Sequence, residues 1–148
     1  MIESILFTIA MLIYWFSEGC TEGYTWASKE KRKTNILIFG GVKNGQRSGM
    51  GLLDYHAWRL GENIGMVGSI FSAFLFSNFW SLLFVFTGSW MLGYFIYERA
   101  LNYICYKDMF PQKGPWGMMG IEIKRSNIFD CLIALIGITI IIIGVING

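Results

Sequence analysis

The chain has 148 residues, of which 54% are hydrophobic and 17% aromatic, while only 15% are charged. A soluble domain of this length seldom has such a composition, so the sequence indicates an integral membrane protein. The formal net charge of +2 is too small to argue for nucleic acid as a partner.

The first apolar segment, residues 2–24, is expected to be a retained membrane span. No Lys or Arg precedes it and no small-x-small cleavage pattern follows it, so it does not have the composition of a signal peptide. The connection that follows, residues 25–51, contains a short apolar run at 36–39 and then Gly40-Gly41 and Asn44-Gly45, which are turn signals. This pattern predicts either a small hairpin or an interfacial dip.

The middle of the chain is expected to form two spans. Asn63 to Tyr97 is a stretch of 35 residues without Asp, Glu, Lys or Arg, whereas one crossing needs about 20 residues. A turn near Ser77-Asn78 would give spans at residues 52–76 and 79–103. The alternative is a single overlong helix, which would divide the basic residues seven and five across the bilayer, against the positive-inside tendency.

The last part of the chain adds a second connection, residues 104–126, and a fourth span, residues 127–147. Within the connection, Ile121 to Lys124 alternates as a strand does. With four spans, all 12 Lys and Arg residues fall on one side of the membrane. That side is expected to be cytoplasmic, with both termini on the non-cytoplasmic side, in a bacterial inner membrane or a membrane of the endoplasmic reticulum type. The predicted fold is therefore a single all-α transmembrane domain over residues 1–148, an integral membrane four-helix bundle.

Two of the predicted helices have stripes of small residues that would allow close helix packing, either within the chain or in an oligomer. The first stripe comprises Gly61, Gly65, Gly68 and Ser72. The second comprises Asp130, Ala134, Gly137, Ile141 and Gly144.

Ionisable side chains gather near the predicted cytoplasmic ends of the first three spans. The first span contributes Tyr14, Glu18 and Glu22, the second His56, Arg59, Glu62 and Asn63, and the third Tyr94, Glu98, Arg99 and Asn102. Charges at membrane depth are costly and usually have partners or face water. Two explanations are open, namely a set of interhelical ion pairs or a polar pocket between helices.

A metal site in this region would draw on carboxylates and the one histidine of the chain, which are Glu18, Glu22, His56, Glu62, Glu98 and Asp130. The Glu-x-x-His repeat of di-iron bundles is missing, so no metal is favoured. Cys20, Cys105 and Cys131 are isolated from one another in sequence and are expected to be reduced thiols.

A second chemistry is binding of a thiolate or an anionic cofactor by Arg59 and Arg99. An arginine beside a bound thiol favours the thiolate, which is the reactive nucleophile. Glu62, Asn63 and nearby tyrosines would support such a site.

Three short matches make residues 52–144 resemble the family of membrane-associated proteins in eicosanoid and glutathione metabolism. Glu62-Asn63 is similar to the Glu-Asn pair of the family's second helix. Arg99, followed seven residues later by Tyr106, is similar to the Arg and Tyr of its third helix. Residues 114–117, Gly-Pro-Trp-Gly, are similar to the connection before its fourth helix.

The chain also departs from the family pattern. Arg59 stands where the family usually has asparagine, and Leu52, Tyr55 and His56 stand in the region where the family has arginines. Arginine binds carboxylates through paired hydrogen bonds, so these departures would weaken recognition of glutathione.

The resemblance implies a trimer that binds glutathione between neighbouring subunits and acts on lipophilic substrates as a transferase, peroxidase or isomerase. In that picture Arg59 or Arg99 would be catalytic. The cofactor-binding residues would be Glu62, Asn63, Asn102, Tyr103 and Tyr106. The alternative is a non-enzymatic oligomeric membrane protein in contact with lipid, which would be an ion pore, a transporter component or a structural subunit of a larger assembly. A pore would have Glu18, Glu22 and Glu62 facing water.

Overall fold

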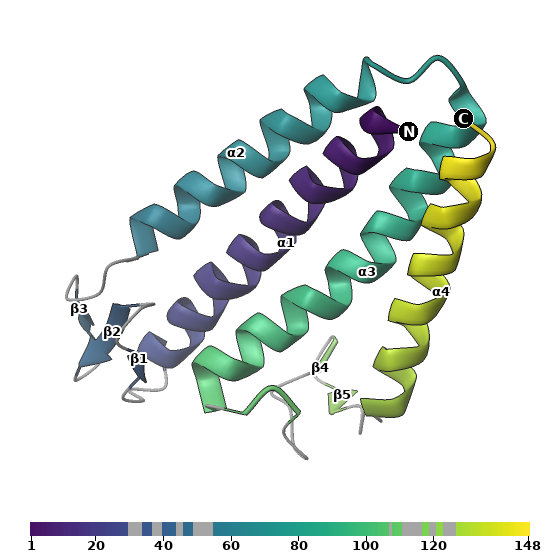
Figure 1. Cartoon of the computed structure of the whole chain (residues 1–148). Coiled ribbons are helices and arrows are strands. Elements are labelled where there is room, and N and C mark those ends of the chain that lie inside the picture. The colour runs from purple at the N-terminus through teal and green to yellow at the C-terminus, as the bar shows by residue number, and fades with distance from the viewer. Residues whose placement is uncertain are drawn as a thin grey trace.

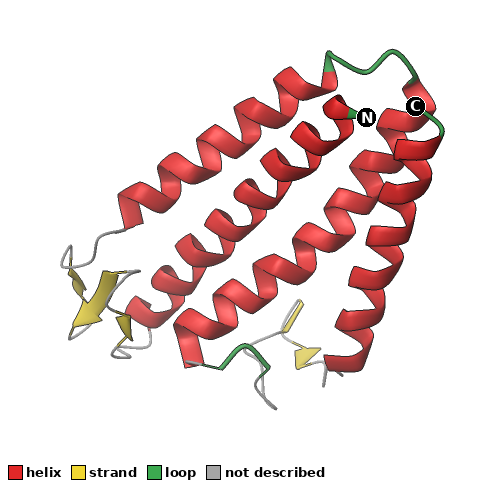
Figure 2. Cartoon of the chain, viewed as in Figure 1, coloured by secondary structure: helices red, strands yellow, loops and turns green. Residues whose placement is uncertain are grey.

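The computed structural model describes residues 1–29, 34–36, 40–43, 46–48, 55–106, 108–110, 117–118, 121–122 and 127–148. Most of these residues belong to four helices (Figure 2). The helices are α1 (Ile2–Lys29), α2 (Tyr55–Ala73), α3 (Phe79–Tyr106) and α4 (Asn127–Ile146).

Three of the helices are long and apolar enough to cross a membrane. The corresponding segments are Ile2–Gly23, Phe79–Cys105 and Asn127–Ile146. The prediction of a helical membrane protein is confirmed at this level. Helix α2, with 19 residues, is long enough but not apolar enough to be one of the three.

The helices lie side by side in a row, in the order α2, α1, α3, α4 (Figure 1). Helix α1 packs against α2 on one side and α3 on the other, and α3 packs against α4. Both chain termini lie at the same end of the helices as the turn between α2 and α3. The arrangement is thus an open layer, whereas the sequence predicted a four-helix bundle.

The predicted turn near Ser77-Asn78 is present and separates α2 from α3. Backbone hydrogen bonds tighten the end of α2, from Phe74 N to Phe71 O (3.2 Å) and from Leu75 N to Ser72 O (3.1 Å). The side chain of Asn78 then accepts a hydrogen bond from Trp80 N at 2.9 Å. Asn is a favoured residue for capping a helix N-terminus in this way. The alternative of one overlong helix is therefore wrong.

Both stripes of small residues are packing faces, as predicted. A Cβ atom at Gly65 would lie 2.5 Å from Tyr14 N and 2.8 Å from Ala10 O, so α2 approaches the backbone of α1 closely. On α4, a Cβ atom at Gly137 would lie 2.8 Å from Gly88 O of α3. Small residues permit such close backbone approach between helices in lipid.

The first connection contains a three-stranded antiparallel sheet of β1 (Thr34–Ile36), β2 (Gly40–Lys43) and β3 (Gln46–Ser48). This confirms the predicted hairpin. The second connection contains a short pair, β4 (Gly117–Met118) and β5 (Ile121–Glu122). The predicted alternation from Ile121 to Lys124 is confirmed for its first two residues, and the rest of it lies outside the described residues.

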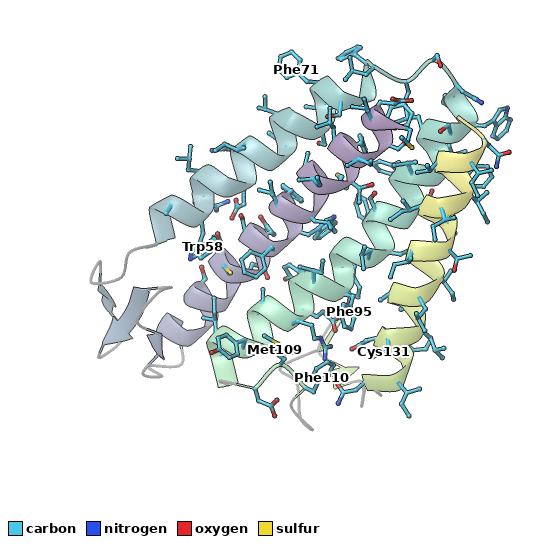
Figure 3. The ribbon with its side chains drawn as sticks, viewed as in Figure 1. Trp58, Phe71, Phe95, Met109, Phe110 and Cys131 are labelled. Carbon is cyan, nitrogen blue, oxygen red and sulfur yellow. The ribbon has the colours of Figure 1, made fainter. Side chains whose placement is uncertain are left out.

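Large apolar side chains cover the outer surfaces of the layer. Phe71 of α2 is 70% exposed and points away from the other helices (Figure 3). On α4, Ile128 is 73% exposed. Such a surface is typical of helices that face lipid, whereas a soluble monomer seldom exposes so large an apolar area.

Candidate functional site

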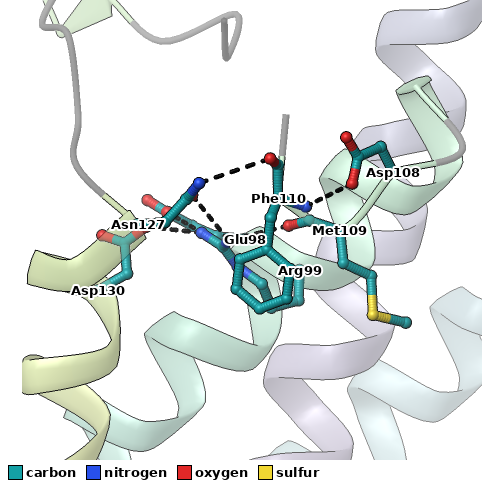
Figure 4. Close-up of polar contacts among 7 residues, drawn as sticks. All are labelled: Glu98, Arg99, Asp108, Met109, Phe110, Asn127 and Asp130. Atoms are coloured by element: carbon teal, nitrogen blue, oxygen red, sulfur yellow. Dashed lines mark hydrogen bonds and ion pairs between the residues drawn. The ribbon is translucent and has the colours of Figure 1, made fainter. Parts of the chain in front are cut away.

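Arg99 is the centre of a buried ion-pair cluster that joins α3 to α4 (Figure 4). Its Nη2 atom lies 2.6 Å from Asp130 Oδ2 and 3.3 Å from Glu98 Oε2. The guanidinium carbon is 5.2 Å from the centre of the Phe95 ring and 4.7 Å from that of Phe110. Arg99 thus pairs with two carboxylates and contacts two aromatic rings.

The remaining donors of Arg99 hold the chain that follows α3. Nη1 donates to the backbone oxygen of Met109 at 2.9 Å and to Asn127 Oδ1 at 3.3 Å. Among the residues that the structure describes, no acceptor lies within hydrogen-bonding distance of Nε. Removing one partner from such a buried cluster is strongly destabilising, so Arg99 fixes the position of α4 and of residues 108–110 relative to α3.

A second cluster of charges lies between α2, α1 and α3. Arg59 Nη1 is 2.7 Å from Glu62 Oε2, and Tyr97 Oη donates to Glu22 Oε2 at 2.5 Å. Glu18 lies within electrostatic range of Glu62, Glu22 and Arg59. We call Glu18, Glu22, Glu62 and Arg59 the acidic cluster, because it holds three carboxylates and one guanidinium.

The two arginines predicted to be catalytic do not lie together. Arg59 is on α2 and Arg99 on α3, and α1 lies between these helices. Each arginine has its own carboxylate partner, Glu62 for Arg59 and Asp130 for Arg99. The structure therefore divides the predicted polar region into two clusters.

The predicted cofactor-binding residues are also divided. Glu62 is buried, whereas Asn63, the next residue on α2, is exposed. Asn102 of α3 is buried, and no donor among the described residues reaches its Oδ1. Tyr103 is half-buried. Tyr106 ends α3, but its side chain, like that of His56, lies outside the described part of the structure.

The sequence did not predict two of the polar contacts in these clusters. Asp130 was assigned to a packing stripe and a possible metal set, but its role as the partner of Arg99 was not predicted. The signal was its position in the first turn of α4, at the depth of Arg99. Tyr97 was not predicted as a partner of Glu22, although it follows the polar Tyr94 by three residues.

A cavity of about 380 Å³ lies between α1 and α3 and extends to residue 109. Its lining residues are Phe16, Cys20, Phe95, Ile96, Arg99, Ala100, Tyr103, Ile104 and Met109. Successive residues of an α-helix are rotated by about 100°, so Glu18 points away from the side of α1 on which Phe16 and Cys20 lie. The cavity and the acidic cluster are therefore on opposite faces of the helix layer.

No set of three or more His, Cys, Asp or Glu side chains within the described ranges is arranged to hold a metal ion. The sequence matches no protein-family model, no curated protein and no solved structure. The resemblance to the eicosanoid and glutathione family stays a prediction, and the geometry of the two clusters is the basis for inferring function.

Proposed function

We propose that this chain is a subunit of an oligomeric membrane assembly in which the acidic cluster borders a water-filled path for cations. The observation that carries the proposal is the position of Glu18 and Glu22. Both are half-exposed on one face of the helix layer, and both lie within the apolar segment Ile2–Gly23. Charged side chains in such a segment face water or a protein partner.

The charge balance of the cluster favours cations. The guanidinium of Arg59 neutralises part of the negative charge of Glu18, Glu22 and Glu62. An excess of carboxylates lining a narrow aqueous path attracts cations and excludes anions. A cluster that served only to join the helices would need no excess of carboxylates over guanidinium groups.

The open shape of the layer supports an oligomer. In this row of described helices, the carboxylates of Glu18 and Glu22 on α1 stay half-exposed. Copies of the chain arranged around an axis, with this face inward, would enclose the path and leave the apolar faces in lipid. This arrangement requires α2 to cross the membrane as a fourth span. At about 1.5 Å per residue its 19 residues are about 28 Å long, close to the hydrocarbon thickness of about 30 Å.

A glutathione-dependent enzyme fits the geometry less well. A thiolate placed beside Arg99 would lie close to Asp130 and Glu98, which already outnumber the guanidinium. Like charges at this distance repel strongly in a medium of low dielectric constant. We therefore expect no saturable binding of millimolar glutathione in calorimetry, and saturable binding with thiolate absorbance would contradict the proposed function.

Cation flux into liposomes tests the proposal directly. The reconstituted protein is expected to pass small cations in preference to chloride, and Glu18→Gln and Glu22→Gln are expected to lower that preference by roughly tenfold, because each removes one negative charge from the path. The matched control is Glu3→Gln on the same helix. Glu3 pairs with the N-terminal amine at 2.6 Å, far from the cluster. Selectivity that is unchanged in both cluster variants would rule the path out.

A further inference from the structure

The cavity between α1 and α3 is lined almost entirely by apolar side chains. Phe16, Phe95, Ile96 and Ile104 form much of its wall. Phe95 lies within α3, ten residues before the end of its apolar segment at Cys105, and Met109 follows the helix (Figure 3). Its volume of about 380 Å³ lies within the range of sites that hold small organic ligands. An apolar ligand, or the apolar part of one, suits this lining.

Arg99 supplies a buried donor in the wall that lacks an acceptor among the described residues. The residue is 7% exposed, and its Nε–H has no acceptor among the described residues. A buried donor without an acceptor is costly, and within a bilayer there is no bulk water to satisfy it. A ligand in the cavity that carries an acceptor oxygen would remove this cost.

The neighbouring charges determine which acceptor fits. Arg99 already has Asp130 at 2.6 Å and Glu98 at 3.3 Å. A third negative group would be repelled by these two carboxylates, whereas a neutral carbonyl oxygen would not be. The site therefore selects a neutral acceptor over a carboxylate or a phosphate.

We infer that the cavity binds an acyl chain of a membrane lipid, with an ester carbonyl of that lipid accepting a hydrogen bond from Nε of Arg99. The depth of Arg99 in the membrane suits a contact with a lipid ester group. Arg99 lies six residues before Cys105, the end of the apolar segment, or about 9 Å along the helix. The ester groups of lipids lie near this boundary between headgroups and hydrocarbon, and Met109, 48% exposed, marks where the cavity meets the surface.

The inference is tested by equilibrium binding of radiolabelled methyl stearate, stearate and octadecane to the delipidated protein in dodecyl maltoside. Methyl stearate is expected to bind saturably, with about one molecule per chain. Stearate and octadecane are each expected to bind at least about tenfold more weakly, a difference of about 1.4 kcal/mol. Binding of stearate as tight as that of its ester would overturn the inference.

Two variants separate the cavity from general partition into the micelle. Ile96→Trp fills the cavity and is expected to abolish saturable binding, while the matched control Leu83→Trp, on the same helix but not in the cavity wall, is expected to retain it. Arg99→Lys keeps the charge that Asp130 needs but lacks Nε–H, so it is expected to bind the ester no better than octadecane. If Ile96→Trp binds methyl stearate as the unchanged protein does, the cavity does not hold a lipid chain. The same conclusion follows if the substitution changes the size of the oligomer but not the binding of the ester.

Lipid binding in the cavity does not depend on the proposed cation path. Methyl stearate binding is expected to survive Glu22→Gln, because Glu22 lies on the opposite face of α1 from Cys20, which lines the cavity. Loss of ion selectivity with intact lipid binding would separate the two proposals.

Discussion

At the scale of single residues, the buried pair of Arg99 and Asp130 is the contact on which the fold depends most. Arg99→Met would remove the cation that lies 2.6 Å from the buried carboxylate of Asp130 and 3.3 Å from that of Glu98. We expect the free energy of unfolding in micelles to fall by about 3 kcal/mol or more, measured by circular dichroism during denaturant titration.

The double variant Arg99→Met/Asp130→Leu provides the decisive comparison. It replaces the 2.6 Å ion pair by two apolar side chains, and such replacements are often neutral or stabilising. We expect it to be more stable than Arg99→Met alone. A milder control is Asn127→Ala, which removes a 3.3 Å contact to Arg99 and a 3.5 Å contact to the backbone oxygen of Phe110 and should cost about 1–2 kcal/mol. A double variant less stable than Arg99→Met would contradict the assigned role of the pair.

The sequence identified most of these polar residues, and the spacing of three residues between Arg59 and Glu62 already allows their ion pair, but it did not identify Asp130 as the partner of Arg99. Glu18, Glu22, Glu62, Arg59 and Arg99 could be singled out because charges are rare in apolar segments. Which carboxylate of α4 meets Arg99 of α3 depends on which helix faces pack together, and that arrangement is not encoded in the spacing of residues along one helix.

At the scale of helices, the contact between α1 and α2 depends on a glycine. We expect Gly65→Ala to destabilise the protein by about 1–3 kcal/mol, because the added Cβ would lie 2.5 Å from Tyr14 N and 2.7 Å from Tyr14 Cα. Backbone atoms cannot move aside without separating the helices. Thermal unfolding in detergent measures the effect.

Gly68→Ala is the matched control one turn further along α2. There the added Cβ would lie 3.2 Å from the Ala10 side chain, and the gain in helix propensity of up to about 1 kcal/mol offsets the tighter contact. We expect little change in stability. Equal destabilisation by the two substitutions would show that close backbone approach is not the cause.

The helices themselves were predictable because apolar length and turn chemistry are local properties. The expected spans 2–24 and 79–103 correspond to the longer helices Ile2–Lys29 and Phe79–Tyr106. Within the expected span 52–76, α2 covers Tyr55–Ala73 and residues 52–54 lie outside the described residues, while Asn78 caps the next helix. At the end of α1 the polar residues Thr25, Ser28 and Lys29 continue the helix beyond the apolar segment, so hydropathy alone underestimates its length.

At the scale of the whole molecule, the difference between an expected bundle and an observed layer has a physical origin. Helix α1 uses two nearly opposite faces, with Gly19 and Gly23 toward α3 and Tyr14 and Ser17 toward α2. Opposite contact faces produce a row, and adjacent ones would produce a bundle. The spacing of small residues predicted that contacts would form but did not determine which helices would meet.

The arrangement of the helices in a row also leads us to predict how the chain crosses the membrane. If α2 crosses the bilayer, the turn at Ser77 and strand β3 must lie on opposite sides. In a variant with Cys20, Cys105 and Cys131 replaced by alanine, we expect Ser77→Cys to react with an impermeant maleimide from the outer face of sealed cells. Gln46→Cys should react only after permeabilisation, because the positive-inside tendency assigns the basic end of the helices to the cytoplasm.

The C-terminus provides an internal check on this experiment. Asn78 Nδ2 donates to Asn147 O at 2.9 Å, so the turn and the end of α4 must lie on the same side of the membrane. Asn147→Cys should therefore react with the same sidedness as Ser77→Cys. If Gln46→Cys reacts from that side too, α2 lies along the membrane surface and does not cross. The carboxylates of the acidic cluster would then border only one half of the bilayer, and a continuous cation path through this subunit would be excluded.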